Sequence, residues 1–537
     1  MSAQVETLIR GSNFSLKEWL FTTDHKRIAV LYMIGSFAAF FLAGIMAMLM
    51  RTELAYVGPT VTSNPTTYNV WLYFHGAAMI LGYQIPAVTG FFANYYVPIM
   101  IGAKDVAFPR LNALSVWLFW MGIVLALLTF VIPDPPDIMW TGYPPYSTGP
   151  LSGNTAFYTW TVLLIGFSSI AGGVNFLTTI IRMRAPGITW DKLNIFIWCI
   201  VGAFIIQLVF VPVLGTAVTM LTLDKYIGTN YFNASMGGTA IIYENLFWFY
   251  SHPAVYVIFL PAVGMLYEIT ATFSRNRVFN YKGVVYAGII GTVALSGEVW
   301  VHHIFVSGMP SWIVILQSFT TLLISAPVGL LMIGLIGTLW RGSIDFKTPM
   351  LYVVGFLFLF LIGGLTGIPN AMSAIYIHIH GTQWITAHFH YVMAISVTTA
   401  IIGGTYYLWP KMTGRMYSET LGKLGFYLFF IGVNLTFFPW LYLGYLGMPR
   451  RYYDYQQFPQ FQPLQAFITY SSYLIFVSAL VILISLIHSL IKGEKAPQNP
   501  WGSKSLEWTH TQSPPPPGNF KEPVKISEDW DPYGYDK

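Results

Sequence analysis

Six of the eleven histidines in this 537-residue chain lie within stretches that are otherwise apolar. A polar side chain inside a membrane is costly, and its presence there points to function. A lone histidine in such a stretch is ordinarily a hydrogen-bonded structural residue, but neutral imidazole is also the commonest metal ligand in proteins. Six of them with paired spacings predict metal chemistry; they are His75, His252, His302, His303, His388 and His390.

His388 and His390 are two residues apart, so on an α-helix their side chains point about 200° apart. One helix can therefore ligate two haems on opposite flanks, with Phe389 between them. His75, on another predicted helix, can supply the second axial ligand to one of these haems. The other haem then keeps one face open for a gas.

His302 and His303 are adjacent and cannot both face one haem. Together with His252 they can form a copper site of three imidazoles. Tyr256 follows His252 by four residues, which places both side chains on one face of a helix. The histidines therefore predict two haems and one copper ion close together.

The elements that hold these histidines are predicted to be membrane helices. The chain is 55% hydrophobic and only 9% charged, whereas a soluble domain carries roughly a quarter charged residues. Apolar stretches of about 20 residues mark membrane spans. The predicted fold is an all-α membrane protein, a bundle of twelve transmembrane helices near 27–50, 69–101, 112–132, 156–182, 194–222, 242–270, 282–308, 311–340, 349–367, 382–409, 419–446 and 466–492.

Basic residues alternate along the connecting segments and predict the orientation. Under the positive-inside rule the segments rich in lysine and arginine face the cytoplasm. They include both ends of the chain, so residues 1–26 are a cytoplasmic N-terminal segment, 27–492 the membrane domain and 493–537 a proline-rich cytoplasmic tail without a packed core. The segments on the opposite side hold few basic residues: Arg51, Lys225, Arg450 and Arg451.

Other classes of site are excluded or disfavoured by the composition. The single cysteine, Cys199, excludes an internal disulfide and any cysteine-based metal site within this chain. The net charge of +5 is distributed by membrane side and does not indicate nucleic-acid binding. No cleavable presequence is evident, and the predicted location is the inner membrane of a prokaryotic cell, crossed many times.

Several motifs resemble those of subunit I of the haem–copper oxidase superfamily. They are DHKRI at 24–28, HGAAMILG at 75–82, FWFYSHPAVYV at 247–257, VWVHHIF at 299–305, TAHFHYVM at 386–393 and GMPRRY at 447–452. The resemblance covers nearly the whole chain in order. It implies a respiratory enzyme that passes electrons from a low-spin haem to a high-spin haem and copper centre, with haems of a or b type.

The resemblance also implies a role for each matching residue. His75 and His390 match the axial pair of the low-spin haem, His388 the ligand of the high-spin haem, and His252, His302 and His303 the copper ligands. Tyr256 matches a tyrosine that oxygen reductases link covalently to the first copper histidine. Residues matching the surroundings of copper and haem are Trp248, Arg51, Arg450, Arg451 and His380; Gly381 replaces the acidic neighbour expected at a magnesium site.

Proton routes match the A-type branch only in part. Asp105, Asn94 and Asn112 match the entrance of its D-channel, and the Tyr250–Ser251 pair replaces the glutamate that many relatives carry where Ala254 stands. The lysine of a second route is replaced by Leu331, and a nearby threonine by Val328. Glu298 stands where relatives are apolar; four residues before His302, it is predicted on the same helical face, as a proton donor or metal-shell ligand.

Because of these departures, the sequence does not decide which gas is the substrate. Tyr256 and the D-channel residues favour reduction of O₂ to water with proton pumping, whereas Leu331, Val328 and Glu298 favour reduction of NO to N₂O, and the balance favours NO. A non-redox transporter with buried histidines is a remote alternative. The chain lacks a dinuclear copper motif and a covalent haem-attachment motif, so electrons are expected from a subunit II-like partner, fed by cytochrome c or quinol, with further small subunits.

Overall fold

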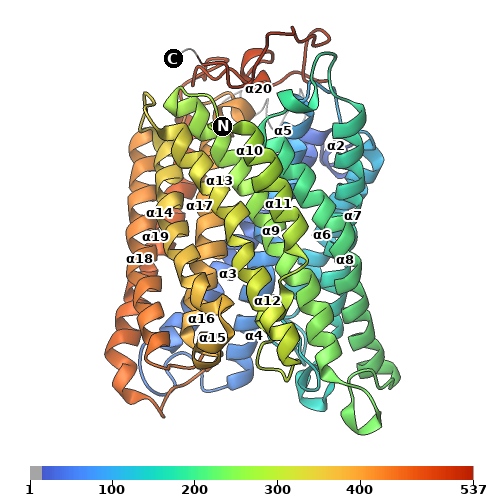
Figure 1. Cartoon of the computed structure of the whole chain (residues 1–537), viewed down its shortest axis with the longest axis vertical. Coiled ribbons are helices and arrows are strands. Elements are labelled where there is room, and N and C mark those ends of the chain that lie inside the picture. The colour runs from blue at the N-terminus through green and yellow to red at the C-terminus, as the bar shows by residue number, and fades with distance from the viewer. Residues whose placement is uncertain (1–14, 536–537) are drawn as a thin grey trace.

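The structure, a computed structural model, describes residues 15–535. Within these residues the regular elements are helices, and extended segments pair only at two isolated bridges, Thr382 with Pro449 and Arg415 with Lys495. Figure 1 shows the long helices running side by side as one bundle, with α2 and α20 at the same end. We call this end, which carries the C-terminal tail, the tail end.

The α-helices have the following bounds in chain order. They are α2 (Leu16–Leu20), α3 (His25–Glu53), α4 (Pro65–Ala77), α5 (Ala93–Met100), α6 (Pro109–Leu128), α7 (Ala156–Arg182), α8 (Ile195–Ile227), α9 (Ala240–Ser274), α10 (Tyr281–Gly283), α11 (Ile290–Ser296), α12 (Ser311–Leu323), α13 (Ser325–Leu339), α14 (Thr348–Ala371), α15 (Ser373–Ile379), α16 (Gln383–Phe389), α17 (Ser396–Thr413), α18 (Glu419–Tyr445), α19 (Gln462–Lys492) and α20 (Leu506–Thr509).

Several membrane spans contain π-helical turns next to their α-helical parts. π-helical turns occur in η1 (Ala78–Gln84), η2 (Pro86–Phe92), η7 (Val284–Ile289) and η9 (His390–Ile395). Pro86 accounts for one of them, because proline lacks an N–H and clashes with the preceding turn, which widens the helix. π-helical turns are frequent at functional sites, and η9 begins at one of the predicted haem ligands.

Eleven helices in residues 15–535 are long and apolar enough to cross a membrane. The predicted spans correspond to these helices, with one exception. The predicted span 282–308 is helical only over Tyr281–Ser296, which is too short to be counted with the eleven. Gly297 and the β-branched Val299 and Val301, all poor helix formers, follow the last helical turn.

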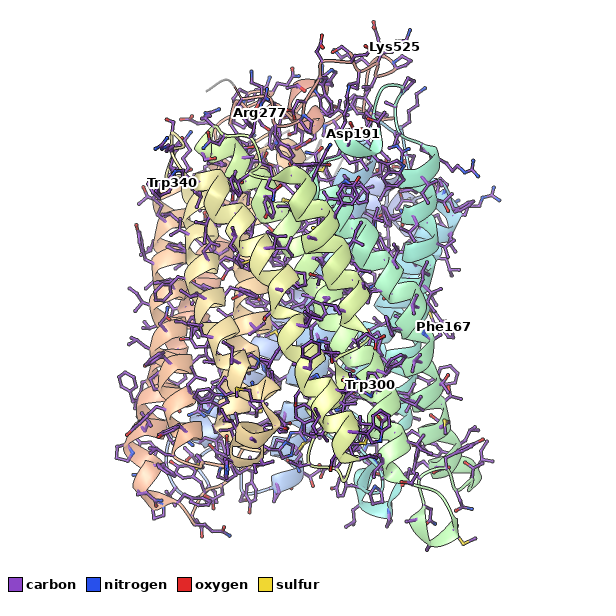
Figure 2. All side chains as sticks on the ribbon, in the orientation of Figure 1. Phe167, Asp191, Arg277, Trp300, Trp340 and Lys525 are labelled. Atoms are coloured by element: carbon purple, nitrogen blue, oxygen red, sulfur yellow. The ribbon has the colours of Figure 1, made fainter. Side chains whose placement is uncertain are left out.

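The side chains are distributed as a membrane bundle requires. Figure 2 shows Asp191, Arg277 and Lys525 at the tail end, whereas Phe167 and Trp300 lie along the bundle. Neighbouring helices pack as antiparallel pairs, notably α6 with α7, α8 with α9, and α18 with α19. The most deeply buried span is α9, whose most apolar stretch is 89% buried. This central helix carries His252 and Tyr256.

The tail differs from the sequence-based prediction of a segment without a packed core. Its aromatic and apolar residues join the main hydrophobic core at the tail end of the bundle; they are Trp501, Leu506, Trp508, Val524, Tyr533 and Tyr535. Lys411 of α17 donates hydrogen bonds to the tail carbonyls of Gln498, Thr511 and Gln512. The proline content led to the wrong prediction, because the prolines shape the tail while the aromatic residues between them anchor it.

Candidate active site

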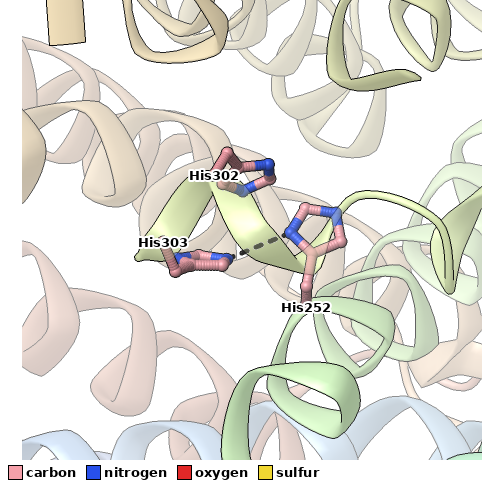
Figure 3. Close-up of side chains that lie close together, drawn as sticks. All are labelled: His252, His302 and His303. Atoms are coloured by element: carbon pink, nitrogen blue, oxygen red, sulfur yellow. Dashed lines mark hydrogen bonds between the residues drawn. The ribbon is translucent and has the colours of Figure 1, made fainter. Parts of the chain in front are cut away.

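Three histidines from two segments converge in the bundle. His252 comes from α9, and His302 and His303 from the short 3₁₀-helix η8 (Trp300–His303). One ring nitrogen of each lies within 4.8 Å of the others. Figure 3 shows the three rings around a common space, with His252 Nδ1 3.1 Å from His303 Nε2. Buried His252 Nε2 has no hydrogen-bond partner in residues 15–535, so this donor set fits a bound copper ion.

The local backbone makes this convergence possible. A 3₁₀-helix has three residues per turn, so two consecutive side chains point about 120° apart and can approach one ion from two sides. Trp248, one turn before His252 on α9, stacks on His303 with ring centroids 3.7 Å apart and planes 6° apart. The indole N–H of Trp248 donates to the hydroxyl of Tyr143. Trp248 and Tyr143 therefore fix the plane of the His303 ring.

Tyr256 lies one helical turn beyond His252. The two ring centroids are 5.1 Å apart, and both residues line the same cavity. The phenol is buried, with 9% of its surface exposed. The Tyr256 ring therefore lies beside His252 in this cavity, and its O–H group is a candidate to hold or donate a proton there.

His75 and His390 face each other across the same cavity. Their rings are nearly parallel, with centroids 6.5 Å apart and planes 11° apart. Two imidazoles that bind one metal from opposite sides, each with its nitrogen about 2 Å from the ion, require a centroid separation of about 6 Å. The pair therefore fits the two axial positions of one haem iron.

The tautomers of the three predicted haem ligands are set by the hydrogen bonds that their Nδ1 atoms make. Nδ1 of His75 lies 2.9 Å from the carbonyl of Ala43, and Nδ1 of His390 lies 2.7 Å from that of Thr386. Nδ1 of His388 lies 3.1 Å from the carbonyl of Gly363. A carbonyl can only accept, so each Nδ1 carries the proton and each Nε2 keeps a lone pair for a metal.

All six histidines line one cavity of about 1120 Å³. An ordinary small-molecule pocket has roughly 300–1,000 Å³, so this cavity has room for more than one large planar cofactor. Gly367 lies against His388: a Cβ there would be 3.0 Å from the Cε1 atom of the imidazole. The glycine leaves space beside the predicted ligand of the high-spin haem.

Cationic side chains lie at the cavity rim. Arg51 donates to Gln465 Oε1 (2.9 Å) and Thr469 Oγ1 (2.9 Å), but its buried Nε and Nη1 have no partner in the described residues. Burial and the charge of Arg451 lower the pKa of Arg450 to about 10. Carboxylates such as haem propionates suit these guanidinium groups in charge and geometry. His380 also lines the cavity, with Nδ1 2.8 Å from the hydroxyl of Tyr376.

Glu298 corrects one sequence-based prediction. The helix α11 ends at Ser296, so Glu298 lies in a turn and is not one helical turn from His302 on a shared face. Its side chain is exposed and does not line the cavity. The four-residue spacing was misleading because it applies only while the helix continues.

Glu298→Gln is therefore expected to leave gas turnover within about twofold of the unmodified enzyme, as for an exposed substitution away from a site. Steady-state turnover and the optical spectrum of the purified protein measure this. A fall in turnover of tenfold or more, with the haem spectrum intact, would return Glu298 to the active site.

The predicted proton-path residues lie in three separate places. Asn112 Nδ2 donates to Asn94 Oδ1 at 2.6 Å, whereas Tyr250 and Ser251 line the cavity. Asp105 forms no hydrogen bond to either asparagine; it accepts from the backbone N–H of Val106 at 2.7 Å. Burial raises the pKa of Asp105 to about 6, so this loop carboxyl can hold a proton near neutral pH.

Polar residues that the sequence reasoning missed extend the asparagine pair. Ser115 Oγ donates to the carbonyl of Asn112, and the hydroxyl of Tyr32 lies 3.1 Å from Ser115 Oγ and 2.9 Å from Ser168 Oγ. Ser115 follows Asn112 by three residues, a helical spacing that could have identified it. The row leads from Asn94 into the interior between α3, α6 and α7.

Two further residues missed from the sequence line the cavity, Glu244 and Tyr143. Glu244 precedes Trp248 by four residues and His252 by eight, so its position on the active-site face of α9 could have been read from the spacing. Tyr143 belongs to a loop with no periodic pattern. Its contact with Trp248 could not have been found from the sequence.

Comparison with known proteins assigns the family. Residues 27–474 match the family described as "Cytochrome C and Quinol oxidase polypeptide I". The chain belongs to this family. A haem–copper oxidase chain of this kind is an enzyme, so the transporter alternative is wrong.

Curated relatives and a solved structure agree with this assignment. "Cytochrome c oxidase subunit 1" of Synechocystis sp. is 41% identical over 95% of this chain and 92% of its own length. The protein of the same name from Thermostichus vulcanus is 41% identical over 92% of this chain and 89% of its own length. A solved heme-copper terminal oxidase dimer shares the fold, with a TM-score of 0.77, 18% identity and coverage of 88% of this chain and 85% of that one.

Proposed function

We propose that this haem–copper oxidase chain is the catalytic subunit of an enzyme that reduces O₂ to water. The observation that carries the proposal is the phenol ring of Tyr256, which lies 5.1 Å from the ring of His252 in the same cavity, while Glu298 is exposed and does not line this cavity. The names of the curated relatives support the same substrate. The sequence-based preference for NO depended on Leu331, Val328 and Glu298, and the exposed position of Glu298 removes one of these three supports.

The chain has histidine ligands for each cofactor that this proposal requires. His75 and His390 would hold a low-spin haem, His388 a high-spin haem, and His252, His302 and His303 a copper ion. When bound, these groups supply the electron transfer and the metal chemistry at the gas. The residues of the chain orient the metals, exclude water through the apolar lining and hold a proton at the hydroxyl of Tyr256.

Reduction of one O₂ requires four electrons and four protons. We propose that the protons start at Asp105 and follow the polar row from Asn94 and Asn112 through Ser115 toward Tyr250 and Ser251. The second route has aliphatic residues at Leu331 and Val328, and Leu331 is fully buried. The basic residues of the connecting segments support a cytoplasmic position for the tail end. Electrons come from a subunit II-like partner that receives them from cytochrome c or quinol.

The substrate test is a paired assay on the purified complex. Oxygen consumption and, under anaerobic conditions, N₂O formation from NO are measured with the same electron donor. We expect O₂ turnover at least tenfold faster than NO turnover. NO turnover equal to or faster than O₂ turnover would overturn the proposal and restore the alternative that the closed lysine route favours.

Asp105→Asn is expected to slow turnover by about a hundredfold, because a positioned proton-transfer group contributes typically 10²–10⁴-fold. The pKa of about 6 means that Asp105 is increasingly ionised as pH rises above 6 and can then accept a proton from the solvent. The variant should therefore lose the pH dependence near 6. Turnover from pH 5 to 9 measures this, and an unchanged profile would exclude this proton entrance.

A further inference from the structure

Asn519 of the C-terminal tail is a buried polar residue with four side-chain hydrogen bonds to the bundle. Its Oδ1 lies 2.9 Å from Lys26 Nζ and 3.0 Å from His25 Nε2. Its Nδ2 donates to the carbonyls of Ala103 (2.9 Å) and Lys104 (3.2 Å). The residue is 0% exposed, and its φ of +69° lies in the left-handed region, where asparagine is among the residues that fit best.

These partners fix the orientation of the Asn519 amide. The lysine ammonium can only donate, so it requires the amide oxygen; the two carbonyls can only accept, so they require the amide nitrogen. A flipped amide would lose all three interactions. The oxygen of Asn519 therefore faces His25.

The second nitrogen of His25 also faces an oxygen. Nδ1 lies 2.6 Å from the carbonyl of Asn94, so both ring nitrogens point at acceptors. A neutral imidazole has one N–H and satisfies only one of them, whereas an imidazolium satisfies both. In either protonation state the ring of His25 is held between the carbonyl of Asn94 and the amide oxygen of Asn519.

This cluster adjoins the proposed proton entrance at two points. Asn94, whose carbonyl faces His25, also accepts the hydrogen bond from Asn112. Ala103 and Lys104, held by the amide of Asn519, immediately precede Asp105. Asp24 and Lys26 act electrostatically on Asp105 as well. The tail thus meets both the loop that carries Asp105 and the first asparagine of the polar row.

We propose that Asn519 is a positioning residue of the proton entrance, holding His25 and the loop of Asp105 in place so that the C-terminal tail completes this entrance. The proposal depends on the proton route given above. Asn519 transfers no proton itself; its oxygen helps to hold the ring of His25 against Asn94, and its N–H groups fix the backbone beside Asp105.

The test measures proton uptake by the intact complex with a pH-indicator dye, after a pulse of O₂ to the reduced enzyme, from pH 5 to 9. Asn519→Ala is expected to slow uptake roughly threefold to tenfold, the effect of losing a net favourable hydrogen bond at the site. Asn519→Asp keeps an oxygen toward His25 and Lys26 and adds a negative charge. It should displace the uptake profile to higher pH.

Asn499→Ala is the matched control within the tail. Asn499 donates to the carbonyl of Ser503 and accepts from its N–H, so its loss disturbs the tail alone, and uptake should stay within about twofold. Asp105→Asn, measured in parallel, separates the two proposals. If proton uptake is slow in Asp105→Asn but as fast in Asn519→Ala as in the unmodified enzyme, the proton entrance at Asp105 is supported and the role of Asn519 is overturned.

The reverse result would overturn the route through Asp105 and, with it, the role of Asn519 at this entrance. If the Asn519→Ala protein lacks the haem spectrum, it has not folded correctly, and the Asn519→Asp variant then provides the test. An uptake profile for Asn519→Asp that coincides with that of the unmodified enzyme would then overturn the proposal.

Discussion

His303→Ala is expected to remove the copper ion and to lower gas turnover by about a thousandfold or more. One of three imidazole ligands is lost, and a metal ion that polarises a bound substrate contributes several kcal/mol to the barrier. The low-spin haem should remain, because its proposed ligands His75 and His390 come from α4 and η9, away from η8. Copper content, the reduced optical spectrum and turnover measure the three effects.

His378→Ala is the control for this substitution. His378 is exposed and does not line the cavity, so copper content and turnover should remain near those of the unmodified enzyme. A His303→Ala protein that keeps a full complement of copper and more than a tenth of the turnover would show that the three-histidine cluster is not the metal site.

Helical spacing within single spans predicted part of the candidate site, whereas His302 and His303 lie in the 3₁₀-helix η8, where this spacing does not apply. Because of helical spacing, His388 and His390 lie on opposite flanks, and His252 and Tyr256 on one face. The same rule failed at Glu298, since the helix ends two residues earlier. The spacing of two residues predicts the relative direction of their side chains only where the backbone remains helical. The point at which a helix ends inside a membrane depends on packing.

The tail could not be predicted for a different reason. Composition describes the average preference of a segment, and residues 493–537 are rich in proline and charge. Their packing depends on a few positions: the hydroxyl of Tyr533 lies 2.5 Å from Glu268 Oε1, and Asn519 contacts His25 and Lys26. The partners of these bonds lie hundreds of residues away, where no periodicity in the sequence connects them.

Tyr256→Phe is expected to lower O₂ turnover by about a hundredfold or more while leaving metal binding intact. The substitution removes only the hydroxyl, so the ring packing near His252 is retained. Its loss removes a positioned proton donor, typically worth 10²–10⁴-fold. Two NO molecules consume two electrons and two protons on reduction to N₂O and water, half the demand of O₂, so any NO turnover should fall less.

Tyr267→Phe on the same helix is the matched control. The hydroxyl of Tyr267 donates to the carbonyl of Leu331 at 2.6 Å, outside the cavity, so its removal costs stability but leaves turnover within about twofold. Turnover with both gases and the haem and copper content are measured for each variant. Equal losses with O₂ and NO in Tyr256→Phe would show a general role for the hydroxyl, such as ordering the copper site. A loss confined to O₂ would tie the tyrosine to the extra electrons and protons that O₂ requires, and so fix the physiological gas by chemistry instead of by family resemblance.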